Sequence, residues 1–247
     1  MPTQPLTGKS ALVTGGARRI GRAIALSLAQ AGADVAITFK SSSAESAQTV
    51  REIEALGVRA LAVECNVRSE DSVRQAIAAC VNHCGRLDIV VNNAAIFEAA
   101  PLDSLTLDQW DAVFETNARG PFLVAREALP HLRATQGSIV NIGSLGGLRA
   151  WPSHAHYCSS KAALHMLTQA MAKAFAPEVR VNCVAPGFIE FEDPTGDSKP
   201  EAIRFAARTP MQRNGSAEDI AQAVLYLAAS ANFITGQILF VDGGLGL

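Results

Sequence analysis

Residues 10–32 read SALVTGGARRIGRAIALSLAQAG, and this stretch holds two kinds of hydrophobic pattern joined by glycines. The apolar run that ends at Val13 predicts a buried strand. From Ile20 the apolar residues recur every three or four positions, which predicts a helix that ends at Gly32. The stretch therefore predicts a strand, a tight turn and a helix in succession.

The glycines of this turn indicate a phosphate-binding site. Gly15 and Gly16 permit a tight turn after the strand, and Gly21 permits close packing at the start of the helix. Backbone amides and the helix N-terminus can then face a pyrophosphate.

The strand-then-helix pattern recurs along the whole chain. Near-continuous apolar runs of this kind are typical of strands that are buried on both faces of a parallel sheet. We predict one α/β domain over residues 1–247, a Rossmann fold whose doubly wound, seven-stranded parallel sheet carries helices on both faces. Its ligand crevice is expected at the carboxyl ends of the strands. The six further strand candidates are DVAITF (34–39), VRALAVE (58–64), LDIVVNN (87–93), GSIVNIG (137–143), VRVNCVAPG (179–187) and GQILFVDGG (236–244).

One segment, residues 188–215, breaks the alternation of strands and helices. It is polar, carries prolines and lies between two regular elements. Long loops in compact domains are usually functional, so we predict a lid over the substrate, with a plain surface excursion as the alternative.

Composition excludes several classes of protein. The 247 residues are 49% hydrophobic and 18% charged, carry a formal net charge of -2, and contain no basic run longer than two residues. These values argue against nucleic acid or an anionic membrane as a partner and favour a small-molecule ligand. No apolar stretch approaches the roughly 20 residues of a membrane span, and the first ten residues lack the apolar core of a signal peptide. We expect a cytosolic protein.

The cysteines indicate reduced thiols and no metal site. The number of cysteines is five, and no CxxC motif occurs. Cys80, His83 and Cys84 share one predicted helix and raise the alternative of a metal site, but no fourth ligand cluster accompanies them. We predict that they serve helix packing.

Four motifs, in their order and spacing, resemble the short-chain dehydrogenase/reductase family over essentially the whole chain. They are TGGARRIG (14–21), NNAA (92–95), Tyr157-x-x-x-Lys161 and NCVAPG (182–187). Where the family turn usually has its middle glycine this chain has Arg19, a variant that resembles the pteridine-reductase branch. PLDSLTLDQW (101–110), YCSSKAALHMLT (157–168) and VDGGLGL (241–247) also resemble bacterial members of that branch.

The resemblance implies a nicotinamide cofactor, and the end of the second strand indicates which one. Phe39 is followed by Lys40, Ser41 and Ser42, with no acid before Glu45. A carboxylate there would bind ribose hydroxyls, whereas a cation and hydroxyls suit a 2′-phosphate, so we predict NADPH. A solvated turn lysine is the alternative for Lys40.

The same resemblance implies a set of cofactor contacts. Arg18 is expected near the adenosine end of the cofactor, or else as an exposed cation at the start of the helix. Arg19 is expected near the cofactor phosphates or the substrate. Asn66 replaces the usual aspartate, and its amide can still accept a bond from the adenine amine. The full expected set is Gly15, Arg18, Arg19, Ile20, Gly21, Lys40, Ser41, Ser42, Asn66, Val67, Asn93, Ala94, Ala95, Tyr157, Lys161, Pro186, Gly187 and Ile189.

Catalysis is expected from Asn117, Ser144, Tyr157 and Lys161. Tyr157 and Lys161 are four residues apart on a predicted helix, so they project from one face, and an ammonium nearby favours the ionised phenol. The resemblance implies that Tyr157 passes a proton to a carbonyl oxygen and that Lys161 also binds the nicotinamide ribose. It further implies that Ser144 orients and polarises that oxygen and that Asn117 positions a proton-relay water.

These residues predict an NADPH-dependent reductase of a small ketone or aldehyde. Pteridine reduction is the alternative, although pteridine reductases commonly carry an acidic residue where this chain has Ser144. A non-catalytic NADPH-binding sensor or scaffold is the alternative of another class. By analogy with relatives, we expect a homotetramer built on helices near residues 108–134 and 157–175.

Four aromatic residues near the tyrosine remain open at this stage. His154 and His156 flank the tyrosine, and we expect them at the rim or the helix start, with an acid–base role as the alternative. Phe97 and Trp151 are candidates either for the substrate cleft or for packing.

Overall fold

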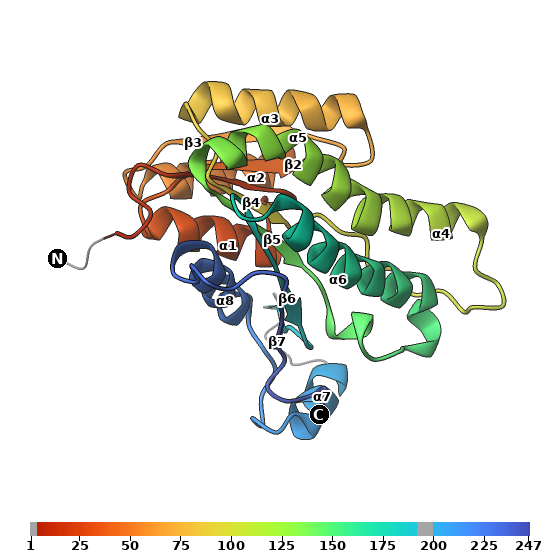
Figure 1. Cartoon of the computed structure of the whole chain (residues 1–247). Helices are drawn as coiled ribbons and strands as arrows, with labels where there is room; N and C mark the ends of the chain where they lie inside the picture. The colour runs from red at the N-terminus through yellow and green to blue at the C-terminus, as the bar shows by residue number, and fades with distance from the viewer. Residues whose placement is uncertain (1–3, 192–199) are drawn as a thin grey trace.

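The computed structural model describes residues 4–191 and 200–247, and its centre is one parallel sheet of seven strands (Figure 1). The strand order β3-β2-β1-β4-β5-β6-β7 is doubly wound about β1, as the sequence predicted. Each strand lies within the predicted apolar run. The bounds are β1 Ser10–Val13, β2 Asp34–Phe39, β3 Ala60–Glu64, β4 Ile89–Asn92, β5 Ser138–Ile142, β6 Arg180–Pro186 and β7 Ile238–Val241.

Pairing brings the carboxyl ends of the strands to one edge. Val13, at the end of β1, is in register with Ile37 of β2 and with Val91 of β4. Every residue of β1, β4 and β5 is buried. This burial explains why these strands are continuous apolar runs in the sequence.

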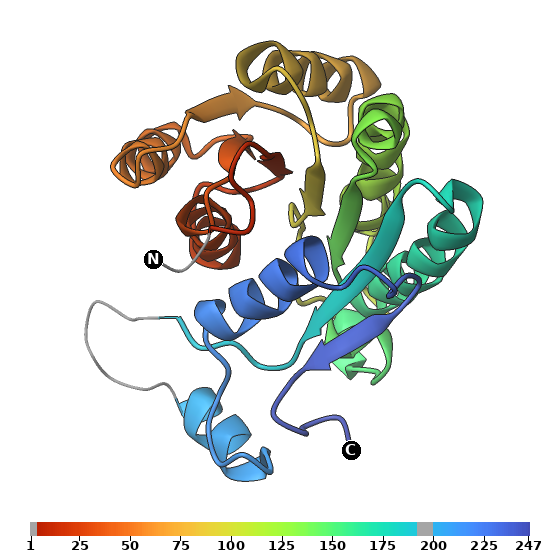
Figure 2. The same cartoon turned by 60° about the vertical axis from the view of Figure 1, so that its left-hand side comes forward.

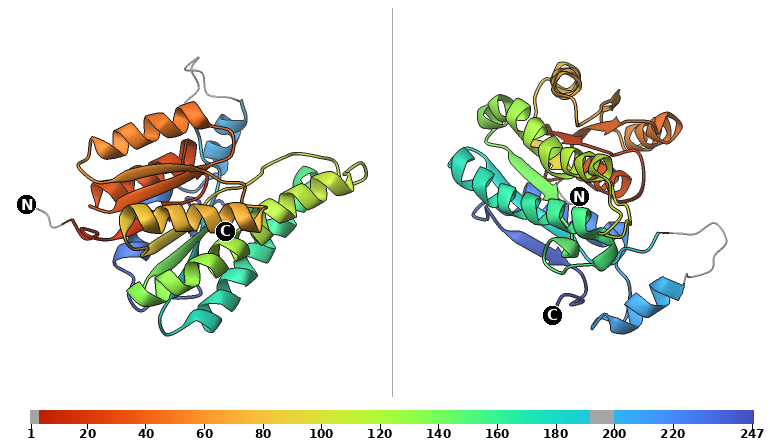
Figure 3. Two further views of the ribbon diagram at one scale, coloured as in Figure 1. Left: turned by 90° about the horizontal axis from the view of Figure 1, so that it is seen from above. Right: turned by 90° about the vertical axis from the view of Figure 1, so that its right-hand side faces the viewer.

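Helices cover both faces of the sheet, as predicted (Figure 3). On one face α1, α2 and α8 pack through residues such as Ile24, Ile53 and Val224. On the other face α3, α5 and α6 pack through residues such as Val73, Leu132 and Met171. The bounds are α1 Arg19–Gln30, α2 Ser43–Glu54, α3 Glu70–Cys84, α4 Leu107–Phe114, α5 Gly120–Thr135, α6 Ala155–Phe175, α7 Pro200–Arg208 and α8 Ala217–Ala229.

Short helical turns of other types complete the carboxyl side of the fold. A π-helical segment, Glu115–Arg119, joins α4 to α5 without a break. Two 3₁₀ turns, Leu145–Gly147 and Pro152–His154, lie between β5 and α6. The first helix ends at Gln30, two residues before Gly32, whose φ of 96° is the left-handed conformation that favours glycine after a helix.

The segment 188–215 differs from the long loop that we predicted. Residues 200–208 form α7, which projects from the body of the fold beyond the carboxyl ends of β6 and β7 (Figure 2). Ala202 of α7 is buried, and the ring of Phe205, also on α7, stacks on the Phe188 ring with centroids 4.5 Å apart. This packing supports a helix despite the polar composition. Residues 192–199 of the predicted lid lie outside the described residues.

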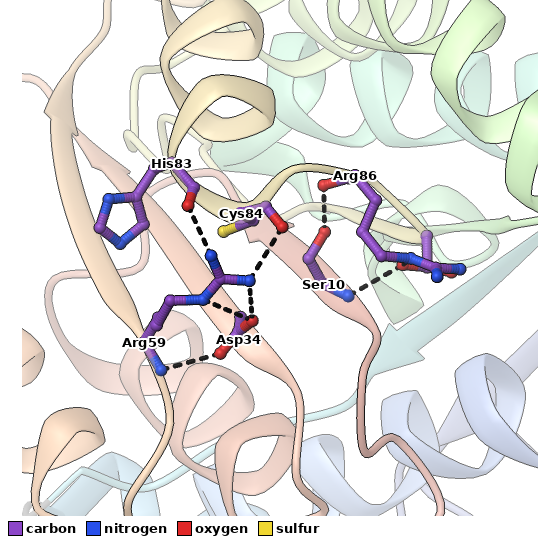
Figure 4. Close-up of polar contacts among 7 residues, drawn as sticks. Ser10, Asp34, Arg59, His83, Cys84 and Arg86 are labelled. Carbon is purple, nitrogen blue, oxygen red and sulfur yellow. Dashed lines mark hydrogen bonds and ion pairs between the residues drawn. The ribbon is translucent and has the colours of Figure 1, made fainter.

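The five cysteines are buried and unpaired, which confirms the prediction of free thiols. Cys80 and Cys84 pack into the core beside α5, whereas the His83 side chain is exposed. The C-terminal end of α3 is instead held by Arg59. Its guanidinium donates to Asp34 at 2.7 Å and to the main-chain oxygens of His83 and Cys84 at 2.9 Å each (Figure 4).

Two further features concern ligands and membranes. Over residues 4–191 and 200–247, no group of three or more His, Cys, Asp or Glu side chains is arranged to hold a metal ion. In the same residues, no helix has the length and apolar character needed to cross a membrane.

Candidate active site

A cleft of about 1020 Å³ lies at the carboxyl edge of the sheet. It is lined by the loops that follow β1, β2, β3, β4, β5 and β6, by the first turns of α6 and by α7. Every residue of the expected cofactor set lines this cleft, together with Ser144. Asn117, the remaining member of the expected catalytic set, does not line it.

The glycine turn after β1 forms a close-packed cradle at one end of the cleft. Gly15 has a φ of 63°, which a side chain would disfavour. A Cβ atom on Gly21 would collide with the main-chain oxygen of Gly15. The Asn93 amide donates to the main-chain oxygens of Thr14 and Gly15 at 2.9 and 3.0 Å and fixes the turn. Such a cradle fits the close approach of a dinucleotide phosphate.

Arg19 occupies a strained position in this turn. Its φ of 51° lies in the left-handed region, where the family turn usually has glycine. Its guanidinium lies 5.2 Å from the centre of the Phe191 ring, which faces the same cleft. Arg18 is exposed, with extended backbone, on the same wall.

The end of β2 presents a cation and hydroxyls to the cleft. Lys40 and Ser41 are exposed, and Ser42 is half-buried. Of the described residues that line the cleft, only Glu201 is acidic, and it lies on α7. This chemistry fits the 2′-phosphate of NADPH better than a free ribose.

At the end of β3 the structure adds a contact that the sequence did not reveal. Asn66 accepts a hydrogen bond from the Arg68 main-chain N–H at 3.2 Å, and a second lone pair of its oxygen remains. Arg68 itself lines the cleft and forms an ion pair with Glu115, which offsets its charge.

Tyr157 and Ser144 line the cleft as neighbours. Tyr157 is 9% exposed, and its burial raises the pKa of the phenol to about 12, although a hydrogen bond with the Ser144 side chain opposes this rise. The Ser144 Oγ accepts a hydrogen bond from the Gly146 main-chain N–H at 3.0 Å, so its hydroxyl proton is free to point toward the cleft.

The raised pKa of the phenol is opposite in direction to the lowered pKa that we expected beside an ammonium. The Lys161 ammonium is 5.8 Å from the centre of the Tyr157 ring and donates to the Ile142 main-chain oxygen at 2.7 Å. Burial lowers its pKa to about 8. Burial is the largest cause of the raised phenol pKa, and it favours the neutral form of Tyr157.

Asn117 lies in the predicted helical region but does not face the cleft. It lies in the π-helical segment, is 1% exposed, and has its side chain turned toward the chain that follows β4. Its Oδ1 accepts from the Ile96 main-chain N–H at 2.8 Å, and its Nδ2 donates to the Ile96 oxygen at 2.9 Å and to Ser160 at 3.1 Å. Both amide protons are thus engaged within the protein, and the side chain ties α6 to one wall of the cleft.

Aromatic side chains lie around the Tyr157 phenol and form one wall of the cleft. The sequence alone did not decide whether Phe97 and Trp151 would lie there. Phe97 is 64% exposed. Its ring packs at right angles to the Tyr157 ring, with centroids 4.8 Å apart, and stacks on the His154 ring, with centroids 4.6 Å apart. Trp151 lies parallel to Tyr157 at 6.1 Å. Phe97, Trp151 and His154 all line the cleft. His156 lies at the start of α6, as expected, but it is fully buried and does not reach the rim of the cleft.

Several other lining residues could not be found from the sequence because they come from distant segments. They include Arg149, Phe188, Phe191, Glu201, Arg204, Phe205, Arg208, Leu245 and Leu247. Their grouping depends on the tertiary position of α7 and of the C-terminal residues, which no local motif marks.

Two comparisons with known proteins both match reductases over nearly the whole chain. A family model described as enoyl-(acyl carrier protein) reductase matches residues 15–246. A 3-oxoacyl-(acyl-carrier-protein) reductase FabG from Staphylococcus aureus is 39% identical over 242 residues, which cover 96% of this chain and 98% of that protein.

Solved structures with bound cofactor are also similar. A short-chain dehydrogenase from Burkholderia cenocepacia in complex with NADP matches with a TM-score of 0.92 and 39% identity, covering 98% of this chain and 100% of that chain. A blue fluorescent protein from a metagenomic library in complex with NADPH matches with a TM-score of 0.91 and 35% identity over the same shares.

Proposed function

Because this chain belongs to the short-chain dehydrogenase/reductase family of oxidoreductases, we propose that it uses NADPH to reduce a small carbonyl compound, a ketone or an aldehyde. The observation that carries the proposal is that Ser144 and Tyr157 line the same cleft with their hydroxyls close enough to interact, and that Lys161 lies beside the phenol ring. Two neighbouring hydroxyl donors suit a carbonyl oxygen on which negative charge develops.

NADPH is the proposed cofactor for two reasons. Gly15 and Gly21 line the cleft at positions with no space for a side chain, which suits the close approach of a phosphate. Lys40, Ser41 and Ser42 add a cation and hydroxyls to the same cleft. Two similar structures contain NADP or NADPH. When bound, NADPH supplies the hydride of the reaction.

The residues of the chain supply the proton and hold the carbonyl. Tyr157 is protonated at neutral pH, and burial raises its pKa further; it donates its proton to the carbonyl oxygen as charge develops there. The Ser144 hydroxyl donates a hydrogen bond to the same oxygen. Lys161 would hold the nicotinamide ribose of bound NADPH, and its charge would stabilise the phenolate that remains. Asn117 acts through Ile96 and Ser160, which fix the wall of the cleft and α6.

The preferred substrate is an activated ketone such as a β-keto ester or a diketone. Pterin reduction is the second candidate, because Arg19 lies over Phe191 in the cleft and its guanidinium suits the polar edge of a pterin ring. Protonation of a ring position gains less from the Ser144 and Tyr157 pair than a carbonyl oxygen does. A sensor or scaffold without turnover would have no chemical need for Ser144, Tyr157 and Lys161 together.

The experiment is NADPH oxidation across β-keto esters, diketones, simple aldehydes and dihydrobiopterin, with the wild type and with Ser144→Ala. We expect reduction of an activated ketone and a loss of about 100-fold or more in the variant. Efficient turnover of dihydrobiopterin with none of any carbonyl would reverse the order of the two substrates. Tight NADPH binding with no turnover of either class would favour the non-catalytic alternative.

We also propose a homotetramer that uses the outer faces of α4, α5 and α6, by analogy with relatives of this family. Phe122 on α5 and Met166 on α6 are large apolar side chains that are 42% and 65% exposed in the single chain. Burial of such side chains between subunits would be favourable.

A further inference from the structure

The imidazole of His165 lies directly beneath the turn that carries Ser144. His165 is on α6, is 9% exposed, and packs edge-on against Phe240 of β7 at 6.0 Å. The Ser144 main-chain N–H points at its Nε2 atom, with 3.5 Å between the two nitrogens.

Two glycines, Gly143 and Gly147, leave the space that the His165 ring occupies. A Cβ atom on Gly143 would stand 2.5 Å from the His165 Nε2, and one on Gly147 would stand 2.5 Å from the His165 Cε1. The ring is therefore wedged between the residue before Ser144 and the end of the 3₁₀ turn that Ser144 caps. Any side chain at either glycine would displace the imidazole or the turn.

The contact fixes the protonation of the ring. Nε2 can accept from the Ser144 N–H only when it carries no proton, so a neutral His165 must hold its proton on Nδ1. Burial and the nearby Lys161 charge lower the pKa of His165 to about 4, which keeps the ring neutral at physiological pH.

His165 also joins two parts of the centre. It follows Lys161 by four residues on α6, so both side chains project from the same face of the helix. One residue thus connects the helix that carries Tyr157 and Lys161 to the loop that carries Ser144.

We propose that His165 is a positioning residue, whose neutral imidazole accepts a hydrogen bond from the Ser144 main-chain N–H and so holds the Ser144 hydroxyl beside Tyr157. The inference rests on the proposed reduction and adds a residue to it. His165 does not line the cleft and acts only through Ser144.

The contact is tested first without turnover, by the nitrogen chemical shifts of His165 in the full-length, ¹⁵N-labelled protein. We expect a neutral ring with the proton on Nδ1 near pH 7, and a Ser144 amide proton that moves upfield in His165→Leu. A ring protonated on Nε2 would overturn the proposal, whatever substrate the enzyme uses.

The consequence for catalysis is tested by a double-mutant cycle with His165→Leu, Ser144→Ala and the pair. We expect His165→Leu to lower kcat on a reduced ketone by about tenfold, because small misplacements of a catalytic group carry such losses. The dissociation constant of NADPH should change less than twofold. Adding His165→Leu to Ser144→Ala should cost no more than Ser144→Ala alone, because the two residues act as a unit.

Two further variants separate positioning from packing. His165→Gln keeps an acceptor near the position of Nε2 and should restore most of kcat, and Phe240→Leu loosens the same pocket but keeps the acceptor, so its kcat should stay near wild type. Losses that multiply in the cycle, or a His165→Gln variant as slow as His165→Leu, would overturn the proposal. If the wild type reduces no carbonyl, the proposed function fails, and the nitrogen shifts still decide the contact.

Discussion

The ammonium of Lys161 lies 5.8 Å from the centre of the Tyr157 ring, and burial moves the pKa values of the two groups in opposite directions. The phenol is raised to about 12 and the ammonium is lowered to about 8. Because each buried group favours its neutral form, Lys161 is the first of the two to lose its proton as the pH rises.

The pH dependence of the enzyme should follow this order. Below pH 8 Lys161 keeps its charge, and above pH 8 it loses the charge, while Tyr157 remains protonated. We expect kcat/KM for NADPH, which reports the cofactor-free enzyme, to fall as the pH rises through about 8. Steady-state rates between pH 6 and 10 measure this. A constant kcat/KM up to pH 10 would show that the Lys161 charge is not needed or that its pKa is not lowered.

Tyr157→Phe should nearly abolish turnover and leave the affinity for NADPH close to that of the wild type. The phenol acts mainly in the transition state, and the phenyl ring preserves its packing against Phe97 and Trp151. Lys161→Ala should impair both turnover and NADPH binding. Rapid-quench turnover and calorimetric titration separate the two effects. A tyrosine variant that retains most of its turnover would mean that another group donates the proton.

Lys40→Ala should weaken NADPH binding by about tenfold and leave NADH binding unchanged, because one charge-assisted contact to the 2′-phosphate is lost. The wild type should prefer NADPH over NADH by at least about tenfold for the same reason. Lys173→Ala, which removes an exposed lysine of α6 that does not line the cleft, is the matched control. Equal affinity of the wild type for the two cofactors by calorimetry would contradict this assignment.

Local patterns made the sheet and the glycine turn that lines the cleft predictable from the sequence. Buried parallel strands read as continuous apolar runs, and their carboxyl ends share one edge, so motifs far apart in the chain meet there. The role of Gly21 was also predictable, because a glycine at the start of the first helix indicates close packing against the preceding turn, and a Cβ atom there would collide with the Gly15 oxygen.

Properties that depend on tertiary distance could not be predicted. Asn117 has the expected residue type and spacing, but its partner Ile96 lies on another segment and engages both ends of the amide. The spacing of Tyr157 and Lys161 gives their common face but not their burial, which reverses the expected direction of the phenol pKa. A helix at 200–208 also depends on contacts, here the stacking of Phe205 on Phe188.

The assembly should respond to a charge on the outer face of α6. Met166 is 65% exposed and lies within the helix proposed to contact another subunit, so Met166→Glu should shift a tetramer toward smaller species. Light scattering after size-exclusion chromatography measures the mass. Phe233→Glu, at a fully exposed position outside the proposed contact, is the control. A wild type that elutes as a monomer would refute the tetramer directly.

Phe97→Ala should raise KM for ketones that carry an aromatic substituent and leave the affinity for NADPH unchanged. The ring is 64% exposed in the single chain, faces the cleft and meets the edge of Tyr157, so a flat substituent beside the reacting carbonyl would cover it. An aromatic contact of this kind contributes about 0.5–1.5 kcal/mol beyond area burial, so KM should rise by about three- to tenfold. Phe233→Ala removes a more exposed ring that does not line the cleft and should have no effect. Paired measurements on an aryl ketone and an alkyl ketone of similar volume isolate the ring contact. If Phe97→Ala raised both KM values equally, Phe97 would act through general packing of the cleft rather than by contact with the substituent.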